Sequence, residues 1–115
     1  MKRGTIFGRV VEMQGSPLTL LIYKNEFDGD LFADLVAAMT EEPPDMEAFM
    51  RFAWAMAKTR DDGTSDYEHW LEEFPPEFTL AEGQAALSVI ISATEAELFR
   101  GKPTIRQRLI GWLAK

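Results

Sequence analysis

One segment, Asp45 to Thr59 (DMEAFMRFAWAMAKT), limits the folds that this chain can adopt. Its apolar residues recur at the spacing that lines one face of a helix: Met46, Phe49, Met50, Ala53, Trp54 and Ala57. Phe52 and Met56 flank that stripe, so apolar side chains cover more than half of the circumference. A helix of this kind is normally enclosed by other elements. The sequence therefore predicts a central helix, capped by Asp45 after the helix-breaking pair Pro43-Pro44.

Capping residues and hydrophobic spacing predict further helices on both sides of this segment. The expected helices, each with its N-cap, are 18–27 after Ser16, 31–39 after Asp30, 67–74 after Asp66 and 80–99 after Thr79. The last of these opens with a capping box, because Glu82 follows Thr79 by three residues. Their spacing predicts the following buried residues: Leu18, Leu21, Ile22, Leu31, Leu35, Ala38, Tyr67, Trp70, Leu71, Phe74, Leu80, Leu87, Ile90, Ile91, Thr94 and Leu98.

Residues 5–14 fit two local structures. Their apolar residues recur every three or four positions, and Gly15 follows as a helix stop, which predicts a short helix. Val10 and Val11 favour a strand equally well, and the β-branched and aromatic residues of 18–27 leave a strand possible there too. Residues 5–23 therefore form either helices or a β-hairpin. Together the elements predict an all-α fold, a small compact bundle of about five to six helices.

Composition predicts a soluble intracellular protein. The chain has 115 residues with 46% apolar side chains, which suits a single domain with a genuine core. It has no apolar run close to the ~20 residues that span a bilayer and no signal-peptide pattern, so no membrane partner is expected. It also has no cysteine, which excludes disulfides, thiolate metal sites and a cysteine nucleophile.

The formal charge of −7 is divided unevenly along the chain. Residues 1–98 contain every acidic side chain, whereas all the charged side chains of residues 99–115 are basic. The spacing of the apolar residues over 104–115 predicts an amphipathic helix. We therefore expect an acidic helical domain over 1–98 and a basic C-terminal helix in 99–115, which belongs to the same domain or forms a partner-binding tail. The acidic body repels phosphates and so disfavours nucleic acid as a partner.

No residue pattern for catalysis or cofactor binding is present. His69 is the only histidine, so a multi-histidine metal site cannot form. The glycine patterns that bind nucleotides and the glycine elbow around a nucleophilic serine are also missing. The sequence therefore predicts a protein that is not an enzyme and that uses no metal or cofactor.

Large side chains near the ends of the predicted elements are the candidates for binding another protein. Exposed aromatic rings beside Pro-Pro turns are good anchors for a partner. The candidates are Tyr67, Trp70, Phe74, Phe78 and Phe99 in the body, with Arg106, Leu109, Trp112 and Leu113 in the C-terminal helix. The alternative for each ring is that it seals the core.

Three segments carry a resemblance to a known family. PLTLLIYKNEF (17–27), FAWAMAKT (52–59) and DYEHWL (66–71) occur in this order and spacing. The chain thereby resembles the tail assembly chaperones of long-tailed phages and prophages of Gram-positive bacteria, over most of residues 16–98. One departure is Asp28, where similar proteins more often have glycine after the Glu-Phe pair, and this leaves the turn geometry open.

The resemblance implies a non-enzymatic role in building the phage tail. Such chaperones coat the aggregation-prone tape measure protein in the host bacterial cytoplasm until tail tube protein polymerises around it, and they are absent from the mature virion. Several copies on each client imply weak homo-oligomerisation. A longer product made by ribosomal frameshifting is common in these systems. The alternative function is a small cytosolic adaptor or regulator that docks on one partner through its basic C-terminal helix.

Overall fold

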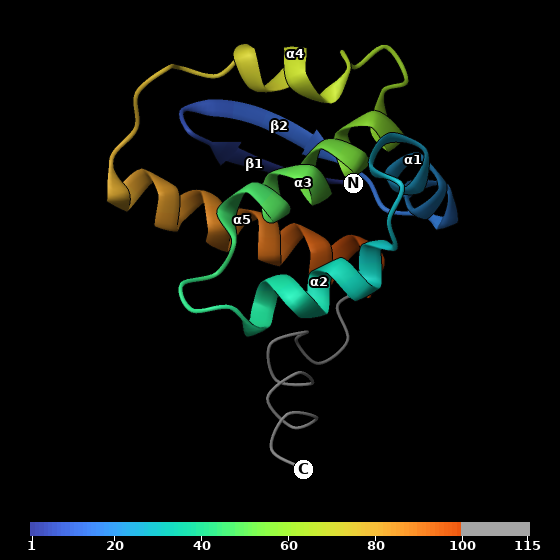
Figure 1. Cartoon of the computed structure of the whole chain (residues 1–115). Coiled ribbons are helices and arrows are strands. Elements are labelled where there is room, and N and C mark those ends of the chain that lie inside the picture. The colour runs from blue at the N-terminus through green and yellow to red at the C-terminus, as the bar shows by residue number, and fades with distance from the viewer. Residues whose placement is uncertain (100–115) are drawn as a thin grey trace.

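The computed structural model describes residues 1–99, which form a mostly helical fold with a small antiparallel hairpin (Figure 1). The elements are β1 (Lys2–Ile6), β2 (Arg9–Met13), α1 (Pro17–Phe27), α2 (Leu31–Thr40), α3 (Met46–Arg60), α4 (Tyr67–Glu72) and α5 (Leu80–Leu98). Helices account for 62% of this part of the chain, so the mostly helical class is confirmed. The helix expected over 104–115 lies outside the described residues.

Helix α3 is the centre of the molecule, as the sequence predicts. It contacts β2 and all four other helices, and its side chains from Ala48 to Met50 and from Phe52 to Ala57 are buried. The Asp45 side chain accepts a hydrogen bond from the backbone NH of Ala48 and caps the helix. Figure 1 shows α3 passing between the hairpin and α4 on one side and α2 on the other.

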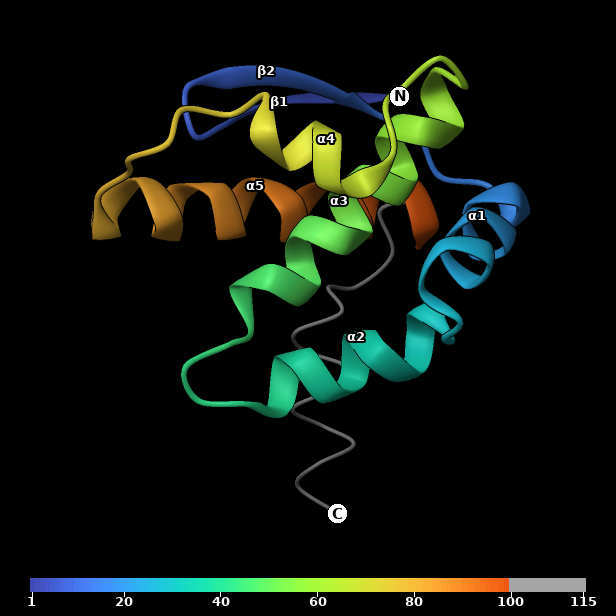
Figure 2. The same cartoon turned by 45° about the horizontal axis from the view of Figure 1, so that its top comes forward.

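The N-terminal segment is a β-hairpin, so the short helix predicted for residues 5–14 is wrong and the alternative is confirmed. Ile6 pairs with Arg9, which leaves a two-residue turn at Phe7 and Gly8. Both turn residues have positive φ, 48° and 81°, as a type I′ turn requires. The hairpin lies along α5 on the side away from α2 (Figure 2), and Gly4 permits that packing because a Cβ there would collide with Val89.

Helix α1 faces the core with different residues from those predicted. The predicted Leu18 and Leu21 remain 51% and 53% exposed, and Ile22 is only half-buried. The fully buried residues are Thr19 and Tyr23 instead. Their hydroxyls have half-buried partners: that of Thr19 lies 2.7 Å from the Thr59 hydroxyl, and Tyr23 donates to Asp34 at 2.6 Å. The face of α1 is therefore selected by these hydrogen bonds.

Helix α5 begins where the capping box places it, but its first residue is not buried. Thr79 Oγ1 accepts a hydrogen bond from the backbone NH of Glu82. The Glu82 carboxylate in turn accepts one from the backbone NH of Thr79. Leu80 is 79% exposed, which contradicts its predicted burial, because its side chain projects from the first turn beyond the core. Of the remaining predicted positions, Ile90, Ile91 and Thr94 are buried, and Leu87 and Leu98 are half-buried.

Asp28 ends α1 in the left-handed conformation, with φ 53° and ψ 38°. Its backbone NH donates to the Lys24 carbonyl oxygen at 2.8 Å, which satisfies one carbonyl at the end of the helix. Glycine is the usual residue at such a position. The departure at Asp28 therefore changes the residue without removing a normal C-terminal cap.

No helix within residues 1–99 has the length and hydropathy needed to cross a membrane.

Candidate protein-binding groove

An apolar groove with a volume of about 330 Å³ lies between the start of α3, helix α4 and the loop that leads to α5. The groove residues are Phe7, Met46, Glu47, Met50, Tyr67, Leu71, Phe74, Pro75 and Phe78. Glu47 is the only charged side chain among them. Rings and thioethers that can adjust to differently shaped partners therefore line most of the groove.

Phe78 is the most exposed ring of the groove, with 60% of its surface accessible. It packs against Phe7 with tilted ring planes at a centroid distance of 4.6 Å, and Phe7 and Phe74 form a T-shaped pair at 6.3 Å. Phe7 is a bulky residue with positive φ, a conformation that costs free energy and persists only where its surroundings stabilise it. The hairpin turn thus places Phe7 against the loop after α4 and builds one end of the groove.

Tyr67 and Glu47 form the polar end of the groove. The Tyr67 hydroxyl donates to Glu47 Oε2 at 2.6 Å, and the same oxygen lies 3.0 Å from Arg51 Nε. Burial and the hydrogen bond to Glu47 both raise the pKa of the Tyr67 phenol above its usual range. Tyr67 therefore stays neutral, and its ring remains an apolar surface at every physiological pH.

The structure brings together part of the predicted partner-binding set. Tyr67, Phe74 and Phe78 line the groove. Trp70 is only 2% exposed and packs edge-on behind Phe74 at 4.8 Å, so it supports the groove from within the core. Phe99 lies at the far end of α5, against Phe32. The remaining members, Arg106, Leu109, Trp112 and Leu113, lie outside the described residues.

Sequence reasoning missed the contribution of Phe7 and assigned Met46 and Met50 only to the core. Met50 is 6% exposed and Met46 is half-buried, so each side chain has one surface in the core and another at the groove. Their position in the first turns of the central helix is the only signal in the sequence. Phe7 carries no such signal, because its place depends on the hairpin.

The three segments that carry the family resemblance meet in one aromatic cluster. Phe27 from the first segment lies 5.6 Å from Trp54 of the second and 4.9 Å from Tyr67 of the third, measured between ring centroids. Trp54 and Tyr67 also lie 6.1 Å apart. These residues hold α1, α3 and α4 together. The sequence pattern that carries the resemblance is therefore explained mainly by core packing.

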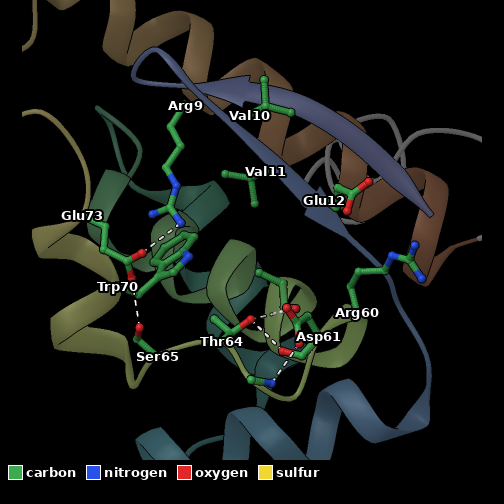
Figure 3. A pocket seen from close by; sticks show the side chains of 12 residues that line it. Arg9, Val10, Val11, Glu12, Arg60, Asp61, Thr64, Ser65, Trp70 and Glu73 are labelled. Atoms are coloured by element: carbon green, nitrogen blue, oxygen red, sulfur yellow. Dashed lines mark hydrogen bonds and ion pairs between the residues drawn. The ribbon is translucent and has the colours of Figure 1, made fainter.

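A second, polar hollow of about 310 Å³ lies between β2, the end of α3 and α4 (Figure 3). Arg9 Nη2 pairs with Glu73 Oε1 at 3.1 Å, and Ser65 Oγ donates to Glu73 Oε2 at 3.0 Å. The Arg9 guanidinium also lies 5.1 Å from the centre of the Phe74 ring. Arg9 thus braces α4 against the hairpin and fixes the position of Phe74 in the groove.

The polar hollow has little to offer an ionic ligand or a reaction. Two arginines, Arg9 and Arg60, face three carboxylates there, those of Glu12, Asp61 and Glu73. Ser65 has no histidine partner, because His69 is exposed and its Nδ1 lies 2.7 Å from Asp66 Oδ1. That contact raises the pKa of His69. The hydrogen bond from the His69 backbone NH, and then the contact with the His69 ring, lower the pKa of Asp66. Within residues 1–99, no group of three or more His, Asp or Glu side chains could hold a metal ion.

Comparisons with known proteins add no relative. No protein-family model matches the chain, and no curated protein or solved structure matches it either. The resemblance to tail assembly chaperones stays a prediction based on the three sequence segments.

Proposed function

We propose that this protein is a tail assembly chaperone of a long-tailed phage or prophage, and that it binds the tape measure protein through the apolar groove. The observation that carries the proposal is the groove itself, in which exposed Phe78 lies beside Tyr67, Phe74 and two methionines. Tail tube protein would then replace the chaperone as it polymerises around the tape measure protein. The site of action would be the host bacterial cytoplasm, with no chaperone left in the mature virion.

The chemistry of the groove suits a helical client without a fixed sequence. An amphipathic helix binds such a groove by inserting apolar side chains spaced three or four residues apart. Met46 and Met50 have flexible, polarisable side chains that can repack around different partners, and Phe78 adds a large ring at the edge. The groove holds only a short stretch of helix, so a long client would need many copies of the protein.

The charge of the body supports the same role. Residues 1–99 contain 19 acidic and seven basic side chains, which give a formal charge of −12. Copies lined up along a client would repel one another outside their contacts, and this repulsion keeps a loaded complex dispersed. A client surface that is apolar and weakly basic would be attracted to the groove.

Co-expression with the tape measure protein encoded in the same genome tests the proposal. The chain offers a matched pair of variants, because Phe78 lines the groove, whereas Leu80 is exposed two residues away and lies outside it. We expect the wild type and Leu80→Ser to keep the client in the soluble fraction with several copies bound, and Phe78→Ser to lose most of that effect. Leu80→Ser should leave folding unaffected. Phe78→Ser removes a ring that packs against Phe7, so far-UV circular dichroism and thermal unfolding of this variant must first show that it is folded.

The proposal is wrong if the client aggregates equally with and without the wild-type protein, or if Phe78→Ser protects it fully. A complex with one copy per partner that depends on residues 104–115 and not on Phe78 would support the adaptor or regulator function instead. Light scattering coupled to size-exclusion chromatography measures the number of copies in either case.

A further inference from the structure

The segment that forms one wall of the groove carries a net negative charge. The segment from Tyr67 to Glu82 forms α4 and the start of α5, and it supplies most of the rings of the groove. It contains five glutamates, all exposed, and no lysine or arginine, and one of the five, Glu73, pairs with Arg9 of the hairpin. An apolar groove on an acidic part of the molecule is complementary to an amphipathic helix whose polar face is basic.

The chain itself contains a segment with that chemistry. Residues 100–115 include five basic side chains and no acidic one. Within them, Ile105, Leu109, Trp112 and Leu113 have the spacing of one helical face. Trp112 would supply the kind of large aromatic anchor that dominates binding in apolar grooves.

The length of α5 decides whether the segment reaches the groove of its own copy. Phe78 in the groove precedes this 19-residue helix and Phe99 follows it, so the helix separates them by roughly 28 Å. The chain from Phe99 to residue 104 spans at most about 18 Å, and the middle of a helix over 104–115 lies about 8 Å further on. A segment would therefore reach Phe78 of its own copy only if residues 100–103 were fully extended back along the whole of α5, which favours the groove of a second copy.

We propose that the groove of one copy binds residues 104–115 of a second copy as a basic amphipathic helix. The contact joins different surfaces of the two copies, so it leaves a free groove at one end of the pair and a free segment at the other. Further copies can add, which gives weak, concentration-dependent chains. The contact between copies does not depend on the proposed function. Its role as a shield, which covers the groove until a client displaces it, rests on the proposed function.

Two variants of the full chain test the contact without any client. Phe78→Ser has a damaged groove and an intact C-terminal segment, and Trp112→Ser has the reverse. Sedimentation velocity over a concentration series should show association for the wild type and for Leu80→Ser. We expect each of the two test variants to associate more than about tenfold more weakly, as for loss of an aromatic anchor at an interface.

Mixing the two variants provides the decisive measurement. The intact segment of Phe78→Ser fits the intact groove of Trp112→Ser, so the mixture should form heterodimers and nothing larger. High salt should weaken the contact, because part of the attraction is electrostatic. A mixture that stays monomeric, a wild type that is monomeric at all concentrations, or a Phe78→Ser variant that still forms chains would overturn the proposal.

The outcome is separable from that of the chaperone proposal. A monomeric wild type that still keeps the tape measure protein soluble contradicts only the contact between copies. Heterodimers in the mixture, together with no effect on the client, support the contact and contradict the chaperone function.

Discussion

Substitution of Gly4 by alanine tests the packing of the hairpin on α5. A Cβ at Gly4 would collide with Cγ1 of Val89, while the Cβ of Val89 would lie at an ordinary 3.6 Å. Val89 cannot easily turn away, because a valine in a helix has one strongly preferred side-chain rotamer. Strand β1 must therefore move away from α5, or α5 must shift. Overpacking of this kind costs about 1–3 kcal/mol, a large share of the stability of a small domain.

Urea unfolding measures the effect, with far-UV circular dichroism and the fluorescence of buried Trp54 and Trp70 as signals. Val89→Ala is the matched control and should cost about 1 kcal/mol through lost apolar contact. The double variant, Gly4→Ala with Val89→Ala, should unfold close to the midpoint of Val89→Ala alone, because the colliding methyl group is gone. The packing of β1 on α5 would be refuted if the losses of unfolding free energy in the two single variants simply added in the double variant. It would also be refuted if Gly4→Ala were as stable as the wild type.

Three further predictions concern the C-terminal cap of α1, the core and the only histidine of the chain. Asp28→Gly should raise the free energy of unfolding by about 0.5 kcal/mol, because glycine adopts the left-handed conformation more readily, and a higher urea midpoint would show it. Thr19→Val should cost about 1 kcal/mol in thermal unfolding, since Thr59 loses its buried hydroxyl partner. Asp66→Asn keeps a good N-cap, yet NMR titration should show the pKa of His69 falling towards 6.5. The ion pair of His69 and Asp66 stabilises the fold only at pH values between the pKa of Asp66 and the pKa of His69. This contribution disappears as pH rises through the pKa of His69 or falls through the pKa of Asp66.

Helix positions were predictable from the sequence because the signals are local. Asp30, Asp45, Asp66 and Thr79 each accept a hydrogen bond from a backbone NH in the first turn of the helix that follows. A cap of this kind depends on a residue and its near neighbours, whatever the rest of the fold does. The central position of α3 was predictable for a similar reason, since a helix that is apolar on most sides must be enclosed.

The hairpin was harder to predict because its turn lacks the usual residues. Type I′ turns favour Asn-Gly or Asp-Gly, whereas this chain has Phe7 followed by Gly8. A phenylalanine with positive φ is favourable here only because its ring packs between Phe74 and Phe78, which lie far away in the sequence. The local preference was therefore overruled by tertiary contacts that no local pattern shows.

The buried face of α1 was mispredicted for a related reason. Apolar spacing selects Leu18 and Leu21, but the core accepts Thr19 because Thr59 on α3 provides a hydroxyl partner. A buried polar group is tolerated once its hydrogen bond is satisfied, and the partner here is 40 residues away. Hydrophobic spacing alone cannot identify such a pair.

The groove and the resemblance depend on largely different residues, which makes their tests independent. Phe27 and Trp54 belong to the segments that carry the resemblance, and neither lines the groove, although both contact Tyr67, which does. Phe7, the two methionines and Phe78 form much of the groove and lie outside those segments. Core residues of this kind report how the helices pack, and they say little about what the surface binds. A loss of client protection in Phe78→Ser would therefore support the function on grounds that the shared core pattern cannot provide.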